Sequence, residues 1–361
     1  MNPVFKDYLL VVGSYAKASN TGIYTVRYWS RSKHAVPSSY TLSVVVTTSG
    51  LENPSYLIKH PTKNRIFAAS ERLSHSGQVG EYAMEMQTGH MMFVQAQDVT
   101  KASPCYLAID PSGRHLFSAN YEGGSLSVFA LHEHGGLARK TQEITHQGNG
   151  PIIERQESAH PHAIAIDRQG KYALVTDLGT DEIITYEFHE VTESLSYVAT
   201  HATKPGAGPR LFIFHPLRSI GYAIHELNNT ICVYDYDEAT GMINEKQSVK
   251  TLPDDVTVKS TASHVAVSED GRFLYASNRG HDSIVVYAID ETQGTLTPIQ
   301  WISCGGKVPR HFAITPDGAS LIVANQESDN ISVLSIDPTT GKLTTTKAKL
   351  FVNKPTCVLV M

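Results

Sequence analysis

SPCYLAIDPSGRHLFSAN, residues 103–120, is the stretch that decides the fold. A short apolar run at 106–109 leads into the turn-like sequence DPSG, and a second apolar run follows and ends on a polar residue. Alternating apolar positions around Gly, Pro and Asp are typical of two strands joined by a tight turn. The same pattern returns at residues 53–70, 160–177, 208–225, 262–278 and 309–325.

The spacing of this repeat predicts the architecture. Successive copies lie 46 to 57 residues apart when they are counted at the repeat proline or its replacement. Strand-only units of about that period are typical of propeller blades. We therefore predict an all-β, seven-bladed β-propeller that forms one domain over residues 1–361. The seven starting points are Pro54, Pro104, Pro161, Pro209, Ala262, Pro309 and Pro355.

Both ends of the chain contribute to the last blade in this prediction. Residues 8–15 (YLLVVGSY) and 22–29 (GIYTVRYW) resemble the second and third strands of a blade whose first strand is missing. Residues 354–360 (KPTCVLV) resemble that missing strand. Pairing the two ends closes the ring and removes sheet edges that would otherwise be exposed.

Composition argues against several classes of partner. The formal net charge is −5, only 18% of the residues are charged and no run of Lys or Arg occurs, so we expect neither a nucleic-acid nor a membrane-surface partner. No apolar run is long enough to span a bilayer, and the start of the chain lacks the features of a signal peptide. The four cysteines lie far apart without metal-ligand spacing, which predicts a reduced, cytoplasmic protein. The sequence leaves the oligomeric state open.

Two positions of the repeat change their residue type from copy to copy. Innermost strands of a propeller face the central channel, so we expect the side chains at these positions to meet near one end of it. His160 falls on the same strand face as His162, two residues further on. The position after the repeat proline holds Ser55, Cys105, His162, Arg210, Ser263, Arg310 and Thr356. The position just past the second strand holds Glu71, Tyr121, Leu178, Glu226, Arg279 and Gln326.

The charged members of these positions have two interpretations. Histidine and arginine side chains that converge in a channel can supply a titratable base and an anion clamp. Alternatively, each arginine pairs with a neighbouring carboxylate and only holds adjacent blades together. The second interpretation suits any single residue, but the concentration of charge in repeats three to six favours a site.

The sequence offers little support for other kinds of catalytic or metal site. The sequence has no Gly-rich phosphate loop before a helix, no GxSxG and no HExxH motif. Two histidines and one carboxylate could in principle bind a metal, but the neighbouring arginines would repel it, so we predict neither a metal nor a cofactor. No cationic neighbour in the sequence activates Cys105, and we interpret this thiol as unreactive.

The polar segment from Lys140 to Ser158 lengthens one connection between repeats. Long connections of this kind are either functional loops or surface excursions. The sequence does not choose between an ordered loop beside the channel mouth and an excursion without a role.

Several motifs, taken in order, resemble those of the seven-bladed lactonase family. They are HPH at 160–162, DLG at 177–179, GAGPR at 206–210, HEL at 225–227, SNRG at 277–280 and PR at 309–310. The opening GSYAKASNTGIY is similar to the GTYT…GIY pattern of the family, with Ser14 and Ala16 as substitutions. The family holds bacterial propeller-type 6-phosphogluconolactonases and fungal carboxy-muconate lactonising enzymes. In the muconate branch the suspected active-site residues correspond to His162, Arg210, Glu226 and Arg279.

The ring residues and the resemblance together predict hydrolysis of an anionic sugar lactone, namely 6-phosphogluconolactone in the pentose phosphate pathway. We assign His162 as the base, Arg210 and Arg279 as oxyanion or anion clamps, and Glu226 as an orienting group or proton relay. The substrate contacts predicted from the ring positions are His160, Arg310, Glu71 and Gln326.

Two alternatives stay open from the sequence. Several arginines would suit the carboxylates of a muconate equally well, which would make the protein a lactonising cycloisomerase. A non-catalytic propeller that serves as an interaction scaffold is the other alternative, although the polar asymmetry of the ring disfavours it. Which of the two histidines acts as the base is also left open.

Overall fold

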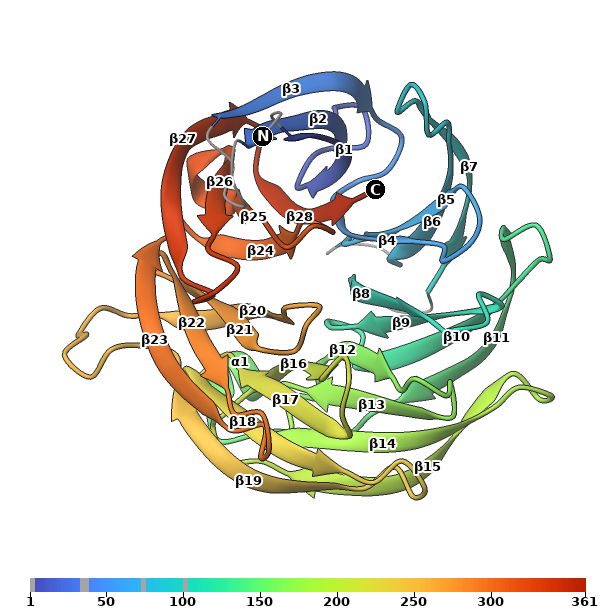
Figure 1. Cartoon of the computed structure of the whole chain (residues 1–361). Helices are drawn as coiled ribbons and strands as arrows, with labels where there is room; N and C mark the ends of the chain where they lie inside the picture. Colours follow the sequence, from blue (N-terminus) through green and yellow to red (C-terminus); the bar gives the residue numbers. More distant parts are fainter. Residues whose placement is uncertain (1–3, 33–38, 73–75, 100–102) are drawn as a thin grey trace.

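The computed structural model describes residues 4–32, 39–72, 76–99 and 103–361. Within these ranges, seven four-stranded antiparallel sheets form a ring around a central channel (Figure 1). Six sheets use four consecutive strands, and the seventh combines strands from both ends of the chain. The predicted seven-bladed β-propeller is therefore confirmed.

The strands of the six consecutive blades run outwards from the channel in chain order. Blade 1 consists of β4 (Pro54–Lys59), β5 (Arg65–Ser70), β6 (Gln78–Met84) and β7 (Met91–Asp98). Blade 2 consists of β8 (Pro104–Ile109), β9 (His115–Asn120), β10 (Ser125–Leu131) and β11 (Leu137–Thr145). Blade 3 consists of β12 (Pro161–Ile166), β13 (Tyr172–Asp177), β14 (Glu182–His189) and β15 (Ser194–Ala202). Blade 4 consists of β16 (Pro209–Phe214), β17 (Ile220–His225), β18 (Thr230–Tyr236) and β19 (Ile243–Lys250). Blade 5 consists of β20 (Thr261–Val267), β21 (Phe273–Arg279), β22 (Ser283–Ile289) and β23 (Leu296–Ser303). Blade 6 consists of β24 (Pro309–Ile314), β25 (Ser320–Asn325), β26 (Asn330–Ile336) and β27 (Leu343–Phe351).

Blade 7 closes the ring, as predicted. Its order is β28 (Pro355–Val360), β1 (Val4–Ser14), β2 (Ile23–Ser32) and β3 (Ser39–Thr48), so the last strand of the chain is the innermost strand. β28 and β1 pair antiparallel, and Leu10 lies opposite Val360. The two termini are thereby joined in one sheet rather than left as two exposed edges.

The turn between the first two strands of a blade explains why the repeat contains Asp and Gly at fixed places. In blade 2 the Asp110 carboxylate accepts backbone N–H bonds from the residues four and five positions later, and Gly113 adopts a positive φ of 71°. Asp167 and Gly170 do the same in blade 3. A short acceptor side chain and a residue without Cβ are what this tight turn requires.

Apolar clusters between neighbouring sheets hold the blades together. Leu10 and Val358 of blade 7 pack in one buried cluster with Ile322 and Val333 of blade 6. Comparable clusters lie between the other blades and leave the polar residues to the channel ends and the rim. Because apolar burial is the dominant favourable term in folding, the interfaces between blades are the main source of stability.

Two details differ from the sequence prediction. The strand β11 extends to Thr145, so the first part of the polar segment that begins at Lys140 belongs to an outer strand and not to a connection. Its half-exposed residues alternate too weakly to be distinguished from a loop. The remaining connection contains the single-turn helix α1 (Ile153–Gln156), and η1 (Gln326–Ser328) is a second short turn that was not predicted.

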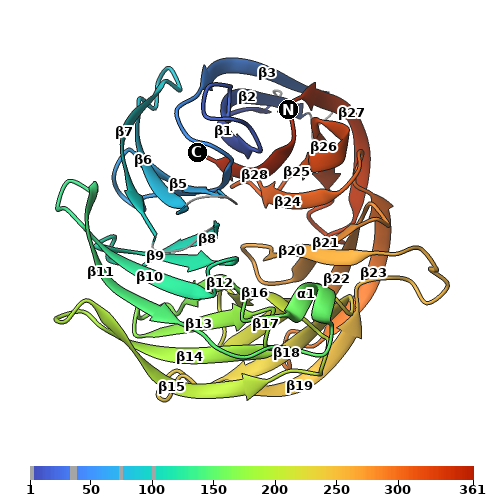
Figure 2. The same ribbon diagram turned by 180° about the vertical axis from the view of Figure 1, so that it is seen from behind.

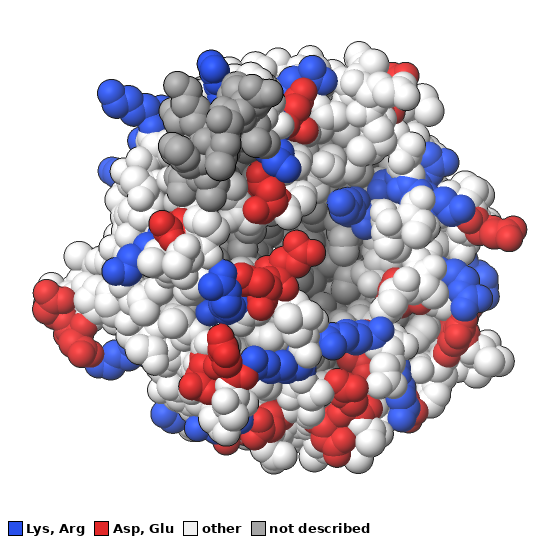
Figure 3. Space-filling model, in the orientation of Figure 1, with Lys and Arg blue, Asp and Glu red and all other residues white. Residues whose placement is uncertain are grey.

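The two faces of the ring differ in what they carry. Figure 2 shows α1 in front, on the face where the innermost strands begin. The opposite face presents the tight turns, and Figure 3 shows acidic and basic side chains mixed over it around a central hollow. None of the helices in the described ranges is long and apolar enough to span a membrane. All four cysteines are buried and free of disulfides.

We predict that Leu10→Ala destabilises the protein by about 2–5 kcal/mol, because it leaves a cavity in the cluster that joins blades 6 and 7. Val45→Ala is the matched control, since Val45 is exposed on the outer strand of the same blade, and we expect it to stay within about 0.5 kcal/mol of wild type. Urea unfolding measures both. Equal effects of the two substitutions would contradict this account of ring closure.

Candidate active site

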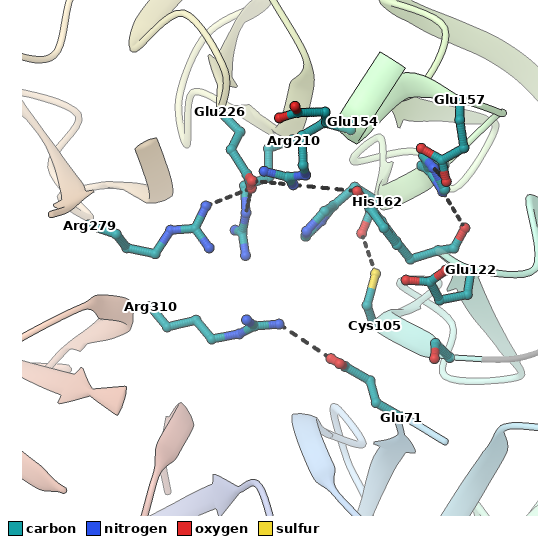
Figure 4. Close-up of a pocket in the computed structure, with 14 residues that line it drawn as sticks. Glu71, Cys105, Glu122, Glu154, Glu157, His162, Arg210, Glu226, Arg279 and Arg310 are labelled. Atoms are coloured by element: carbon teal, nitrogen blue, oxygen red, sulfur yellow. Dashed lines mark hydrogen bonds and ion pairs between the residues drawn. The ribbon is translucent and has the colours of Figure 1, made fainter. Parts of the chain in front are cut away.

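A cavity of about 310 Å³ opens at the end of the channel near α1 (Figure 4). It contains seven of the eight residues that the sequence predicted for the site; Gln326 is the exception. The structure thus brings the predicted residues together, while their catalytic roles stay predictions. The lining residues are Glu71, Ser103, Cys105, Tyr121, Glu122, Glu154, Arg155, Glu157, His160, His162, Arg210, Glu226, Arg279 and Arg310.

The repeat proline explains how the first set of ring residues reaches the cavity. Proline cannot donate a ladder hydrogen bond and is tolerated at the first residue of a strand. The strand register shifts immediately after this proline, so that His162, Arg210 and Arg310 are each skipped in the pairing with the next strand. A bulge of this kind re-aims a side chain, here into the channel.

Glu226 is the centre of the charged network. Its Oε2 accepts a hydrogen bond from Arg210 Nε at 2.9 Å and forms an ion pair with Arg279 Nη2 at 2.7 Å. The same Nη2 donates to the Ala262 carbonyl oxygen at 3.3 Å. Oε1 of Glu226 accepts a hydrogen bond from Arg155 Nη2 at 2.6 Å. The carboxylate is only 3% exposed, and each of its oxygens is therefore engaged by a cation.

The protonation state of Glu226 follows from these contacts. Burial by itself would raise the pKa of Glu226, but the charges of Arg279, Arg210 and Arg155 outweigh burial and hold the pKa well below its usual range. A permanently ionised carboxylate is a poor proton relay. Of the two roles proposed from the sequence, the geometry therefore favours the orienting one.

The cations also influence each other. Burial and the like charge of Arg279 lower the pKa of Arg210 to about 10, so this guanidinium is still charged at pH 7. Arg210 is further fixed by donating from Nη1 to the Ser263 carbonyl at 2.7 Å. It is held by protein groups on two sides, which leaves it less available to a ligand than its neighbours.

Arg310 is held more loosely. Its Nη1 and Nη2 lie 3.4 Å from Gln326 Oε1 and from Glu71 Oε1, which are long hydrogen bonds. Its guanidinium lies 5.1 Å from the centre of the Tyr15 ring. Glu71 is more firmly bound by Tyr15, whose hydroxyl donates to Oε2 at 2.7 Å. Gln326 thus contacts Arg310 from outside the described cavity lining, and its role as a substrate contact stays a prediction.

His162 is suited to accept a proton. Burial first, and then the charge of Arg210, lower the pKa of His162 well below its usual value, so the imidazole is neutral at pH 7. Its Nδ1 is buried and has no hydrogen-bond partner among the described residues. The Tyr121 ring meets the imidazole edge-on at a centroid distance of 5.7 Å and helps to fix its orientation.

His160 is differently placed, which bears on the choice between the two histidines. Its Nδ1 lies 3.0 Å from the Tyr121 carbonyl oxygen, and its Nε2 lies 3.1 Å from Glu157 Oε1. The ring also stacks on Tyr121 at a centroid distance of 4.3 Å. Because both ring nitrogens are engaged by protein acceptors, His162 is the better candidate for the base.

Sequence reasoning missed Tyr15, Arg155 and the exposed glutamates at the cavity mouth. Arg155, Glu154 and Glu157 come from the connection between blades 2 and 3, which lies outside the repeat register and could not be aligned. The open question about this connection is answered in favour of an ordered loop beside the channel mouth. For Cys105, burial raises the pKa of the thiol, which agrees with the interpretation that it is unreactive.

Within the described ranges, no group of three or more His, Cys, Asp or Glu side chains is arranged to hold a metal ion. The cavity does hold the neutral imidazole of His162 and four guanidiniums. Such a set can remove a proton from water and stabilise negative charge on oxygen.

Comparisons with known proteins agree with this architecture. The family model of lactonases with a seven-bladed β-propeller matches residues 9–360. A 6-phosphogluconolactonase from Bacillus subtilis (strain 168) is 34% identical over 305 residues, which cover 84% of this chain and 84% of that protein.

Solved structures of the same architecture cover nearly the whole chain. A protein from Bacteroides fragilis, provisionally assigned as a 6-phosphogluconolactonase, has a TM-score of 0.88 and 31% identity over 98% of both chains. The periplasmic gluconolactonase of Pseudomonas aeruginosa has a TM-score of 0.90 and 30% identity, covering 98% of this chain and 99% of that one.

We predict that the His162 imidazole titrates below pH 6.5, because protonation would place a buried charge beside Arg210. The measurement is a pH titration of the histidine ring signals by NMR, with His162→Gln identifying the signal that disappears. Raising the pH above 6.5 should leave the His162 signal unchanged. A midpoint at or above 6.5 would contradict the neutral imidazole.

We predict that Glu226→Gln destabilises the fold by about 3–5 kcal/mol, since it leaves buried arginines without a counter-charge. Glu122→Gln is the control, because Glu122 is exposed at the mouth of the same cavity and should change stability by less than about 0.5 kcal/mol. Urea unfolding compares them. A Glu226→Gln protein as stable as wild type would show that the arginines do not depend on this carboxylate.

Proposed function

Because the chain belongs to the family of seven-bladed β-propeller lactonases, we propose that it hydrolyses the ester ring of an anionic sugar lactone, and that 6-phosphogluconolactone is the substrate. The product would be 6-phosphogluconate, an intermediate of the pentose phosphate pathway. The observation that carries the proposal is a neutral, buried His162 in the same cavity as Arg279 and Arg310.

The mechanism uses the chain's own side chains. His162 removes a proton from water as the water oxygen attacks the lactone carbonyl carbon, and a tetrahedral oxyanion forms. The guanidinium of Arg279 stabilises that oxyanion, a contribution of about 3 kcal/mol for donors of this kind. When the intermediate collapses, the bond to the ring oxygen breaks and His162 returns the proton to that oxygen. The result is a carboxylic acid and a free hydroxyl.

A phosphorylated substrate fits the guanidiniums inside the cavity, whereas the three exposed glutamates of the lining, Glu122, Glu154 and Glu157, lie at its mouth. Four arginines line the cavity, and the two carboxylates that they contact are Glu226 and Glu71. Arg310, which makes only long hydrogen bonds, is the natural partner for a phosphate oxygen. The Bacillus relative carries the name of the phosphorylated activity, whereas the Pseudomonas relative is named a gluconolactonase.

The alternatives from the sequence have less support. The carboxylates of a muconate would suit the same arginines, but the named relatives reported above are hydrolases of sugar lactones. A scaffold would not require a neutral imidazole buried beside cations. The cytoplasmic location stays a prediction, because the Pseudomonas relative is named a periplasmic protein.

We predict rapid hydrolysis of freshly generated 6-phosphogluconolactone above its spontaneous rate. His162→Ala should lower kcat/KM by about 10²- to 10⁴-fold, and Arg279→Ala by about 10²- to 10³-fold, because they remove the base and the oxyanion donor. The assay follows lactone loss directly. Glucono-lactone without phosphate, measured in parallel, reports how much the phosphate contributes.

Cys105→Ser is the control variant, because Cys105 lines the same cavity without a role in the mechanism, and it should keep most of the activity. Full activity of both His162→Ala and Arg279→Ala would refute the assigned roles. If the wild type fails on both sugar lactones but converts a carboxylated muconate, the lactonising alternative replaces this proposal.

A further inference from the structure

The connection between blades 2 and 3 is longer than the other connections and is firmly anchored. It spans residues 146–160, whereas the next longest spans residues 251–260. His146 is buried at its start and bonds through its two ring nitrogens to Asp177 at 2.7 Å and to the Tyr186 hydroxyl at 2.9 Å.

The other end of this connection is anchored by Gln156. Its side chain is fully buried, donates to the Leu178 carbonyl at 2.9 Å and accepts from the Ile152 backbone N–H at 3.1 Å. Arg155 precedes this anchor and is directed to the cavity. A residue on such a fixed support has a defined position relative to the channel strands.

Arg155 contacts the network at one point. Its Nη2 lies 2.6 Å from Glu226 Oε1 and 3.4 Å from the Tyr121 hydroxyl. Its side chain is 39% exposed, whereas that of Arg279 is 15% exposed. Arg155 thus contacts the Glu226 carboxylate from the cavity mouth, whereas Arg210 and Arg279 contact it from the channel.

Arg155 contacts one carboxylate oxygen of Glu226, and Arg210 and Arg279 contact the other, which affects how Arg279 can pair with Glu226. A guanidinium and a carboxylate commonly pair through two parallel hydrogen bonds. Arg279 instead contacts Glu226 at one point, through an ion pair between Nη2 and Oε2 at 2.7 Å, and the same Nη2 donates to the Ala262 carbonyl oxygen at 3.3 Å. Its buried Nε has no hydrogen-bond partner among the described residues. Figure 4 shows the rest of the guanidinium turned into the cavity. A rotation that paired Nε and Nη2 with both oxygens would satisfy Nε but withdraw Arg279 from the cavity.

We propose that Arg155 is a positioning residue: by bonding to Oε1 of Glu226 and placing a like charge beside that oxygen, it opposes this two-point pairing and keeps Arg279 directed at an anionic ligand. We take this anionic ligand to be the lactone substrate, and in that respect the proposal rests on the proposed function. Arg155 is poorly placed to be the anion clamp itself, because the exposed carboxylates Glu154 and Glu157 lie beside it at the mouth.

The test is a double-mutant cycle read out by binding of inorganic phosphate in isothermal titration calorimetry. Arg155→Met should weaken phosphate binding about tenfold or more, the loss expected when a charge-assisted hydrogen bond to the anion is lost. In an Arg279→Lys background the same substitution should have less than a twofold effect, because lysine cannot form the two-point pair. Arg155→Lys should bind phosphate like wild type, since its ammonium still reaches Oε1.

Equal weakening by Arg155→Met in both backgrounds would overturn the proposal, since Arg155 would then act on the anion directly. No effect in either background, or no phosphate binding by the wild type, would overturn it as well. Phosphate binding that follows the predicted cycle in a protein without lactonase activity would refute the proposed function and leave this inference standing.

A second measurement observes Arg279 itself. The Nε–H signal of Arg279, identified by its loss in Arg279→Lys, should shift in Arg155→Met as Nε gains a carboxylate partner. An unchanged signal would refute the rotation. Arg139→Met is the matched control for both measurements, because Arg139 is 66% exposed on β11 and pairs with Glu193, which does not line the cavity. It should alter neither the binding nor the signal.

Discussion

A single buried carboxylate constrains the whole active end of the channel. An ionised Glu226 is tolerable in the protein interior only because three guanidiniums surround it, and those guanidiniums are tolerable near one another only because of Glu226. The three arginines come from blade 4, from blade 5 and from the connection between blades 2 and 3. The network therefore fixes parts of the chain that no sheet joins.

This arrangement reconciles the two interpretations of the channel arginines. Arg210 is held on both sides by protein groups and fits the view that such residues tie neighbouring blades together. Apart from the ion pair of Arg279 with Glu226, Arg279 and Arg310 make only long hydrogen bonds of 3.3 and 3.4 Å and retain capacity for a ligand. The same charge network can thus be structural at one residue and functional at the next, depending on how many of its donors the protein already uses.

The propeller supplies the geometry on which this network depends. Each innermost strand that begins with proline shifts its register at the following residue, and that residue enters the channel whatever its chemistry. The fold itself tolerates Ser55, Cys105, His162 or Arg210 at this position. Blades held by apolar clusters elsewhere leave these positions open to variation, which is why a scaffold of nearly equal units can carry an asymmetric site.

The sequence by itself determined the number of blades, the closure of the ring by both termini and the set of channel residues, because these follow from local turn chemistry and a repeating register. His162, Arg210, Glu226, Arg279 and Arg310 were found in this way. Only the tertiary structure decided which partners they have. The contacts of Arg155 with Glu226 and of Tyr15 with Glu71 join residues 71 and 56 positions apart, and Arg155 lies in a connection that matches no repeat position. The preference for His162 over His160 likewise depends on burial and on hydrogen-bond partners, and these exist only once the chain has closed into a ring.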